Sequence, residues 1–330
     1  MSQEKHLDRL VKRISMAPGG AAIYGYTAIT INSKYFGYAS HFSIFLYDIK
    51  TFQLAESLCQ GEIRFSIIRL SKTNPDEIAI LYMNGLLIIY DILERTTKMK
   101  FQLPCKKNTR YLSMEYSPKG EELLVFMNDS YDFIKVNLNE GKFRVLVFPS
   151  IDVVKVYRQH PELDNITLFG SVSSKVYIFN SEKITTNYAS FSDHIYYLSF
   201  DPLNTMNCLM ISKSPTWVVF SFLPVFNLIS QSGNSTIKAK AGDWIPALPG
   251  HIVTGSSEHG ILHVWTISNS QVVDTIQLED PPVIAVSSIS DKLVIVTFND
   301  GLFGVVDVTK RSYLYKINNA HKNTIFSCSI

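Results

Sequence analysis

Two histidines four residues apart, His259 and His263, are the best candidates in this sequence for a metal-binding pair. On a helix this spacing would place both imidazoles on one face, where they could hold a zinc ion. The surrounding residues, TGSSEHGILHVW at 254–265, instead read as two short strands joined by a tight Gly/Ser turn. We therefore predict turn and surface roles for these histidines, and we expect neither a metal site nor a cofactor.

No other arrangement of residues predicts catalysis. The sequence contains no GxSxG, HExxH, Walker-type GxxxxGK[ST] or GxGxxG motif, and it lacks the SxDxGxxW box of sialidases. Its cysteines, Cys59, Cys105, Cys208 and Cys328, are too far apart for a CxxC motif, and we predict buried free thiols in a reducing compartment. We predict no catalytic residue, and an enzyme whose residues meet only in the fold is our third hypothesis.

The overall composition is that of a soluble globular protein. The 330 residues are 46% hydrophobic and 18% charged, with a net charge of +2, and this balance argues against a dedicated nucleic-acid binder. The N-terminus lacks the apolar core of a secretory signal, and the longest apolar run, 217–229, is too short to span a bilayer. We therefore predict a cytoplasmic location. The abundance of Phe and Tyr favours strands over helices.

A repeated unit organises the chain from residue 21 onward. In each unit a strand ends in an aromatic residue or Val followed by a small polar residue, and these endings recur at intervals of 41–46 residues. The endings are Tyr47-Asp48, Tyr90-Asp91, Val136-Asn137, Phe179-Asn180, Phe220-Ser221, Trp265-Thr266 and Val306-Asp307. A turn pair precedes each ending at a fixed offset: His41-Phe42, Asn84-Gly85, Ser130-Tyr131, Ser173-Ser174, Ser214-Pro215, His259-Gly260 and Asp300-Gly301. A period of about 40–45 residues is typical of four-stranded propeller blades.

These repeats predict an all-β fold, a seven-bladed β-propeller of four-stranded antiparallel blades at residues 21–319. One such sheet has too little core to be stable alone, whereas stacked sheets bury both faces and radial closure protects their edges. Residues 1–20 are predicted to be an N-terminal tail or a short amphipathic helix. Residues 320–330 are predicted to be either the inner strand of a further blade or a strand that closes the first blade.

The repeats resemble those of the WD-repeat β-propeller family. Tyr47-Asp48 and Tyr90-Asp91 stand in the place of the family's WD dipeptide, and SPKG at 117–120 resembles its turn after the first strand. Ala320-His321 resembles its GH dipeptide. The family's buried His–Ser–Trp–Asp network is incomplete in every blade. Blade six offers Trp265 with Ser256 or Ser257, but His259 stands where the Asp would be.

The resemblance implies a non-catalytic scaffold that binds other proteins within a larger intracellular assembly. Tandem propellers of this kind are similar to those of ciliary-transport and vesicle-coat proteins, so the resemblance also implies a ciliary or coat-associated location. Further propeller or helical repeats of one longer protein are among the partners that it suggests. If the chain is the first propeller of such a protein, residues 320–330 begin the next one.

Propellers bind mostly through the rim of second-to-third strand turns and the loops that enter each inner strand. Large aromatic residues and Arg dominate interface hot spots. The candidate anchors chosen on this basis are Phe42, Arg110, Tyr131, Arg158, Trp244 and His259. Trp244 is the first choice, with packing over the central channel as the alternative interpretation.

A basic stretch between residues 95 and 110 is the second interaction signal. It contains Arg95, Lys98, Lys100, Lys106, Lys107 and Arg110, with no acidic residue after Glu94. Such a stretch could bind an acidic protein, an anionic lipid headgroup or RNA. The alternative is an edge strand whose lysines protect it from aggregation. Lipid or RNA binding through this stretch is our second hypothesis.

Overall fold

The computed structural model describes residues 29–317 with short gaps. The gaps fall at 41–42, 49–53, 60–62, 106–110, 128–131, 148–153, 172, 181–182, 186–194, 213–215, 234–235, 289–290 and 300–301. The predictions for residues 1–20 and 320–330 lie outside the described residues. Within the described part the regular elements are all strands, and no helix there is long and apolar enough to cross a membrane.

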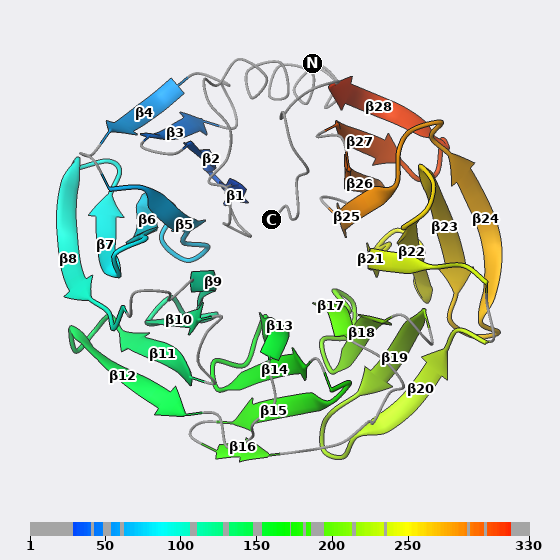
Figure 1. The fold of residues 1–330 in the computed structure, drawn as a ribbon, viewed down its shortest axis with the longest axis horizontal. Helices are drawn as coiled ribbons and strands as arrows, with labels where there is room; N and C mark the ends of the chain where they lie inside the picture. Colours follow the sequence, from blue (N-terminus) through cyan, green and yellow to red (C-terminus); the bar gives the residue numbers. More distant parts are fainter. Residues whose placement is uncertain are drawn as a thin grey trace. The chain divides into compact units, whose positions relative to one another are not determined.

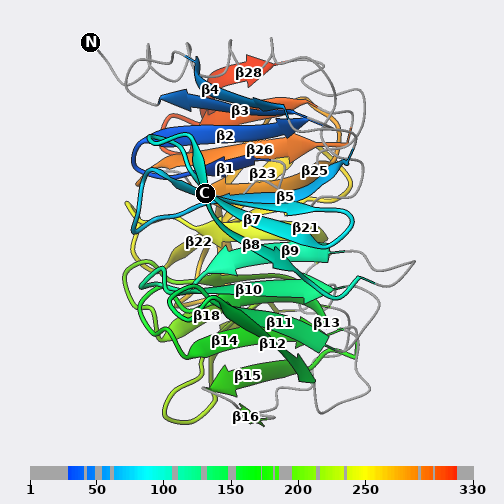
Figure 2. The same ribbon diagram turned by 90° about the vertical axis from the view of Figure 1, so that its left-hand side faces the viewer.

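The first of two compact units contains three four-stranded antiparallel sheets. In each sheet the strands are hydrogen-bonded in chain order (Figure 1), and in Figure 2 the strands of the second and third sheets are seen along their length. Blade one consists of β1 (Ile29–Ile31), β2 (Tyr35–Ser40), β3 (Ser43–Asp48) and β4 (Leu54–Cys59). Blade two consists of β5 (Phe65–Leu70), β6 (Glu77–Tyr82), β7 (Leu86–Asp91) and β8 (Thr96–Gln102). Blade three consists of β9 (Tyr111–Tyr116), β10 (Glu122–Met127), β11 (Asp132–Asn137) and β12 (Lys142–Val147).

The second compact unit contains four sheets of the same topology. Blade four consists of β13 (Val154–Gln159), β14 (Ile166–Ser171), β15 (Val176–Asn180) and β16 (Lys183–Thr185). Blade five consists of β17 (Ile195–Phe200), β18 (Asn207–Ser212), β19 (Trp217–Ser221) and β20 (Asn227–Gln231). Blade six consists of β21 (Ala239–Trp244), β22 (His251–Ser256), β23 (Ile261–Thr266) and β24 (Gln271–Gln277). Blade seven consists of β25 (Val283–Ser288), β26 (Leu293–Phe298), β27 (Phe303–Asp307) and β28 (Ser312–Ile317).

The predicted strand endings are confirmed in every blade. All seven dipeptides, from Tyr47-Asp48 to Val306-Asp307, are the last two residues of a third strand. Four of the seven predicted turn pairs contain undescribed residues, whereas Asn84-Gly85, Ser173-Ser174 and His259-Gly260 lie between a second and a third strand. Gly85 has a φ of 84° and Ser174 a φ of 67°, as a tight turn between twisted strands requires.

The core forms layers between neighbouring sheets of each unit. On β6, Ile78 and Ile80 pack in the layer shared with blade one, whereas Ala79 and Leu81 pack in the layer shared with blade three. Because successive side chains of a strand point to opposite faces, a sheet buried on both faces needs a continuous apolar run. The strand sequences EIAILY and LLIIYD are apolar nearly throughout for this reason.

A β-bulge recurs at one place in the first strands. In β5, β9, β13, β17, β21 and β25 the pairing with the second strand shifts around the second residue, for example at Ser66 between Phe65 and Ile67. An extra residue bends a strand and increases its twist. Neighbouring first strands pack together within each unit, as β5 does with β1 and with β9. The bulges therefore lie in the first strands, through which neighbouring sheets contact each other.

A polar side chain follows most first strands and accepts hydrogen bonds from the next turn. These residues are Asn32, Ser71, Ser117, His160 and Asp201, which occupy the same position in blades one to five. Side chains of Asn, Asp and Ser often satisfy backbone N–H groups in turns, and His160 does so with Nδ1. The predicted SPKG turn is confirmed, and Gly120 has a φ of 75° there.

Candidate interaction surface

One edge of blade two presents apolar side chains on a backbone that is held in place by hydrogen bonds. Three segments meet at this edge: Ile63 and Arg64 before β5, the β6–β7 turn, and residues 103–105 after β8. The Met83 N–H donates to the Arg64 carbonyl (3.0 Å), and the Leu103 N–H donates to the Gly85 carbonyl (2.9 Å). We call the exposed residues Ile63, Arg64, Met83, Asn84, Pro104 and Cys105 the blade-two rim.

Gly85 is required by the close packing of these segments. A Cβ at this position would lie 2.6 Å from the Leu103 carbonyl oxygen and 2.7 Å from the Tyr111 hydroxyl, and the φ of 84° also favours glycine. The Tyr111 hydroxyl donates to the Pro104 carbonyl (2.9 Å), and its burial at the start of β9 anchors residues 103–105. The turn and both loops therefore form one fixed platform.

The apolar side chains on this platform face solvent. Ile63 is 41% exposed and Met83 46% exposed. The Cys105 thiol, which donates to the Met83 carbonyl (3.5 Å), is also exposed, so the prediction of buried cysteines is confirmed for Cys208 and wrong for Cys105. A methionine adapts its shape to an irregular partner, which suits it to a binding surface.

The basic stretch divides into two ion-paired residues, one exposed lysine on β8 (Lys100) and an undescribed part. Arg95 Nε lies 2.8 Å from Glu56 Oε2, and Lys98 Nζ lies 3.0 Å from Asp91 Oδ2 and 3.3 Å from Glu77 Oε2. These acids come from β4, β6 and β7. The basic stretch has no acidic residue along the sequence, but the fold places acids from other strands beside it. Of the predicted basic residues, Lys106, Lys107 and Arg110 lie outside the described residues, and they follow Cys105 directly in the chain.

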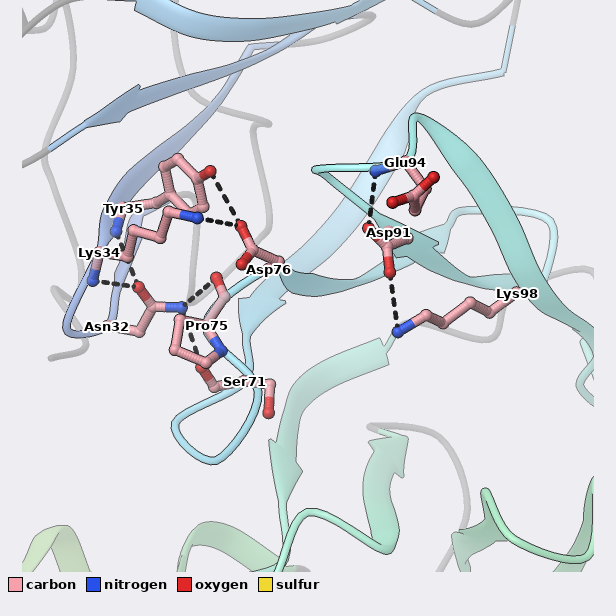
Figure 3. A network of polar contacts seen from close by, with 9 residues as sticks. All are labelled: Asn32, Lys34, Tyr35, Ser71, Pro75, Asp76, Asp91, Glu94 and Lys98. Carbon is pink, nitrogen blue, oxygen red and sulfur yellow. Dashed lines mark hydrogen bonds and ion pairs between the residues drawn. The ribbon is translucent and has the colours of Figure 1, made fainter.

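The opposite edge of blade two carries a network of paired polar groups (Figure 3). The Asn32 amide nitrogen donates to the carbonyls of Ser71 (2.9 Å) and Pro75 (3.0 Å), and so joins blade one to blade two. Asp76 accepts hydrogen bonds from Lys34 Nζ (2.5 Å) and the Tyr35 hydroxyl (3.0 Å). The Asp76 carboxylate raises the pKa of Lys34, as expected for a paired ammonium.

Asp91 lies on the same edge and is also neutralised. Its Oδ1 accepts from the Glu94 N–H (2.9 Å), and its Oδ2 pairs with Lys98 (Figure 3). The backbone hydrogen bond from Glu94 and the pairing with Lys98 lower the pKa of the Asp91 carboxyl. This edge therefore presents compensated charge with one exposed apolar side chain, Leu93, whereas two exposed apolar side chains, Ile63 and Met83, lie on the blade-two rim.

The predicted anchors Trp244 and Arg158 are not on the same rim as His259. Both lie at the ends of first strands, beside the first-to-second strand turns, whereas His259 lies in a second-to-third strand turn at the other edge. Trp244 is only 3% exposed and its Nε1 donates to the Ser199 carbonyl (3.0 Å), which favours the packing interpretation. Arg158 is half-buried, with Nε donating to the Leu198 carbonyl (3.0 Å) and its guanidinium over the Tyr197 ring.

Of the remaining anchors, His259 is exposed, while Phe42 and Tyr131 lie outside the described residues. Among the described residues, no group of three or more His, Cys, Asp and Glu side chains is placed to hold a metal ion. His263 is half-buried on β23, and burial lowers the pKa of its imidazole. Of the three described anchors, Trp244 and Arg158 therefore lie at one edge of their blades and His259 at the other.

The buried hydrogen bond of Trp265 differs from the sequence expectation. The indole Nε1 donates to Thr254 Oγ1 (2.9 Å), so the pairing with Ser256 or Ser257 is wrong. Thr254 is the fourth residue of β22 and faces the core, with no exposed surface. Ser256 Oγ instead accepts from the N–H groups of Glu258 (3.3 Å) and His259 (3.2 Å) in the turn.

Sequence reasoning missed Asp243, a buried carboxylate on β21. Its oxygens accept from the Ser199 hydroxyl (2.6 Å) and from the N–H groups of Trp244 (2.9 Å) and Ser288 (2.8 Å), which links blades five, six and seven. Burial raises the pKa of this carboxyl, although these hydrogen bonds act in the opposite direction. The only sequence feature that could have indicated its burial is its position inside the short strand AKAGDW.

Comparison with known structures identifies the architecture. The sequence matches no protein-family model. The β-propeller domain of Cps50 (Swd1) from Myceliophteria thermophila is similar over 82% of this chain and 93% of its own length, at 10% identity and a TM-score of 0.63. The computationally designed protein Ika8 is similar over 93% and 92% of the two chains, at 14% identity and a TM-score of 0.69. A chain of the mitotic checkpoint complex is similar over 86% and 87%, at 12% identity and a TM-score of 0.66. The seven sheets are therefore the blades of a seven-bladed β-propeller, which confirms the predicted fold class.

Proposed function

We propose that this chain is a non-catalytic, WD-repeat-like propeller that binds another protein through the blade-two rim within a larger assembly. The observation that carries the proposal is the exposure of Ile63 and Met83 on a backbone fixed by hydrogen bonds. A preorganised apolar surface loses little conformational entropy on binding, which favours its use as an interface. A cytoplasmic, ciliary or coat-associated location is part of the same proposal.

The expected partner is an acidic segment with apolar side chains. Its apolar side chains would cover Ile63 and Met83. Its acids would complement the positive charge that the sequence carries directly after Cys105, at Lys106, Lys107 and Arg110. Complementary charge raises the rate of association and selects partners. The ion pairs of Arg95 and Lys98 reduce the charge available to RNA or anionic lipid, and a protein partner is favoured for this reason.

A pair of matched variants tests the proposal. Met83→Glu places a carboxylate in the blade-two rim, and Leu93→Glu places one at the opposite edge of the same blade, where Leu93 is 67% exposed. In quantitative affinity purification from the native source, Met83→Glu should lose proteins that both the wild type and Leu93→Glu retain. The effect should be at least about tenfold, because a buried, unpaired charge opposes association.

The outcome also separates the competing hypotheses. If the wild type, Met83→Glu and Leu93→Glu all capture the same partner proteins, the proposed surface is overturned. Salt-dependent binding to anionic liposomes or RNA, lost when Lys106, Lys107 and Arg110 are changed to Glu, would support the second hypothesis instead. Far-UV circular dichroism of each variant controls for loss of the fold.

A further inference from the structure

The fourth strand of blade five differs from the fourth strands of the other six blades in carrying no charge. Each of the others contains at least one charged residue, namely Glu56 in β4, Lys98 in β8, Lys142 in β12, Lys183 in β16, Asp274 in β24 and Lys316 in β28. The sequence of β20 is NLISQ, and residues 214–237 contain no charged side chain at all. Charged residues on an edge strand discourage pairing with another chain, so β20 lacks this protection.

Three exposed side chains of this segment are apolar, and its exposed polar side chains, such as Asn227 and Gln231, are uncharged. Val225 is 70% exposed, Leu228 47% and Ile229 44%. Ile229 is the bulged residue in the pairing with β19, where Leu228 pairs with Phe220 and Ser230 with Val219. Two adjacent exposed apolar residues depart from the alternation of a regular strand, and the bulge accounts for this departure.

The backbone of β20 is fixed on one side and unpaired with any described strand on the other. It is the last strand of its sheet in the hydrogen-bonding order (Figure 1). Its far end is held by the Ser230 hydroxyl, which donates to the Ile267 carbonyl of blade six (2.7 Å) and lies 3.0 Å from the Ser270 hydroxyl. The outer edge of β20 is therefore held in place and could pair with a further strand. Its exposed apolar side chains lie at residues 225–229.

We propose that the free edge of β20 binds an extended, uncharged apolar segment of another protein, which adds to blade five as a fifth strand. The backbone edge selects an extended chain, because only such a chain can pair with its N–H and carbonyl groups. The surrounding surface selects an uncharged one, because a charged side chain placed against Val225, Leu228 and Ile229 would lose hydration without gaining an ion pair. This surface is independent of the blade-two rim, and neither proposal requires the other.

The test uses the full chain and a labelled peptide of alternating Val and Thr, seven residues long, as the probe. Fluorescence anisotropy should show saturable binding, and hydrogen exchange should show that the probe protects backbone amides within residues 227–231. Leu228→Lys should weaken this binding by about tenfold or more, because it places an unpaired ammonium at the edge. Val273→Lys is the matched control, since Val273 is a similarly exposed apolar residue (52%) on the fourth strand of blade six, and this variant should bind the probe as the wild type does.

A second probe separates strand addition from general apolar contact. The same peptide with alternate backbone nitrogens methylated keeps its side chains but cannot donate along one edge, and it should not bind. The proposal is overturned if the unmodified probe does not bind, if both peptides bind equally, or if Val273→Lys weakens binding as much as Leu228→Lys. It is also overturned if sedimentation shows a dimer of the chain that Leu228→Lys dissociates, because the edge then pairs with a second copy.

Discussion

Asn32 should stabilise the contact between blades one and two more than any single apolar side chain of similar size would. Its side chain makes four hydrogen bonds, two donated to the Ser71 and Pro75 carbonyls and two accepted from the N–H groups of Lys34 and Tyr35. It is only 9% exposed, so water does not readily replace these bonds. At about 1 kcal/mol for each buried hydrogen bond, Asn32→Ala should lower the free energy of unfolding by about 3–4 kcal/mol.

A second substitution separates the turn from the contact between blades. Asn32→Asp keeps the oxygen that accepts from Lys34 and Tyr35 but turns a carboxylate oxygen toward the Ser71 and Pro75 carbonyls. We expect this variant to lose stability while the two amides stay protected from hydrogen exchange, whereas Asn32→Ala should expose them. Urea unfolding followed by circular dichroism measures stability. A loss below about 1 kcal/mol in Asn32→Ala, or wild-type stability in Asn32→Asp, would refute the reasoning.

Two further predictions concern close packing and pH. In Gly255→Ala the new Cβ would lie 2.3 Å from Val283 Cγ1, and we expect a loss of about 1–3 kcal/mol in urea unfolding. Gly233→Ala, with open space around it, should change stability by less than about 0.5 kcal/mol, and equal effects of the two variants would contradict the packing argument. Burial lowers the pKa of His160, whose Nδ1 accepts two backbone N–H groups, so its stabilising contribution is complete above the ordinary value of 6.5 and is lost as the pH falls below it. His160→Asn should therefore reduce the decline of Tm between pH 7 and pH 5, and an unchanged decline would contradict this assignment.

The blades could be predicted from the sequence because each repeat carries the same two local signals. One signal is a turn whose backbone needs positive φ, and the other is a strand that ends in an aromatic residue or Val. Each depends on only a few neighbouring residues, so a single sequence shows it. The positions of Tyr90-Asp91 and Trp265-Thr266 at the ends of β7 and β23 are examples. The bulges of the first strands could not be predicted in this way, because they depend on pairing between strands and leave no residue signature.

The binding surface could not be predicted because exposure and charge pairing are long-range properties. Trp244 was the first choice of anchor, yet only the fold shows that its indole bonds to Ser199 of the neighbouring blade. In the sequence Lys98 is part of a basic stretch, and only the fold shows that Asp91 and Glu77 lie beside it. Met83 precedes an Asn-Gly turn, and nothing in the sequence distinguishes it from a core methionine.

The packing of blades five and six gives the protein an optical reporter of its own. All three tryptophans, Trp217, Trp244 and Trp265, are buried in the single core layer between these blades. Trp217 and Trp265 meet edge to face, with ring centroids 5.8 Å apart. Tryptophan fluorescence, when excited selectively, therefore monitors this one layer and reports nothing directly from blades one to three. Coupled transitions of the two indoles should also give a near-ultraviolet dichroism signal, which disappears when this layer loosens, even if every strand persists.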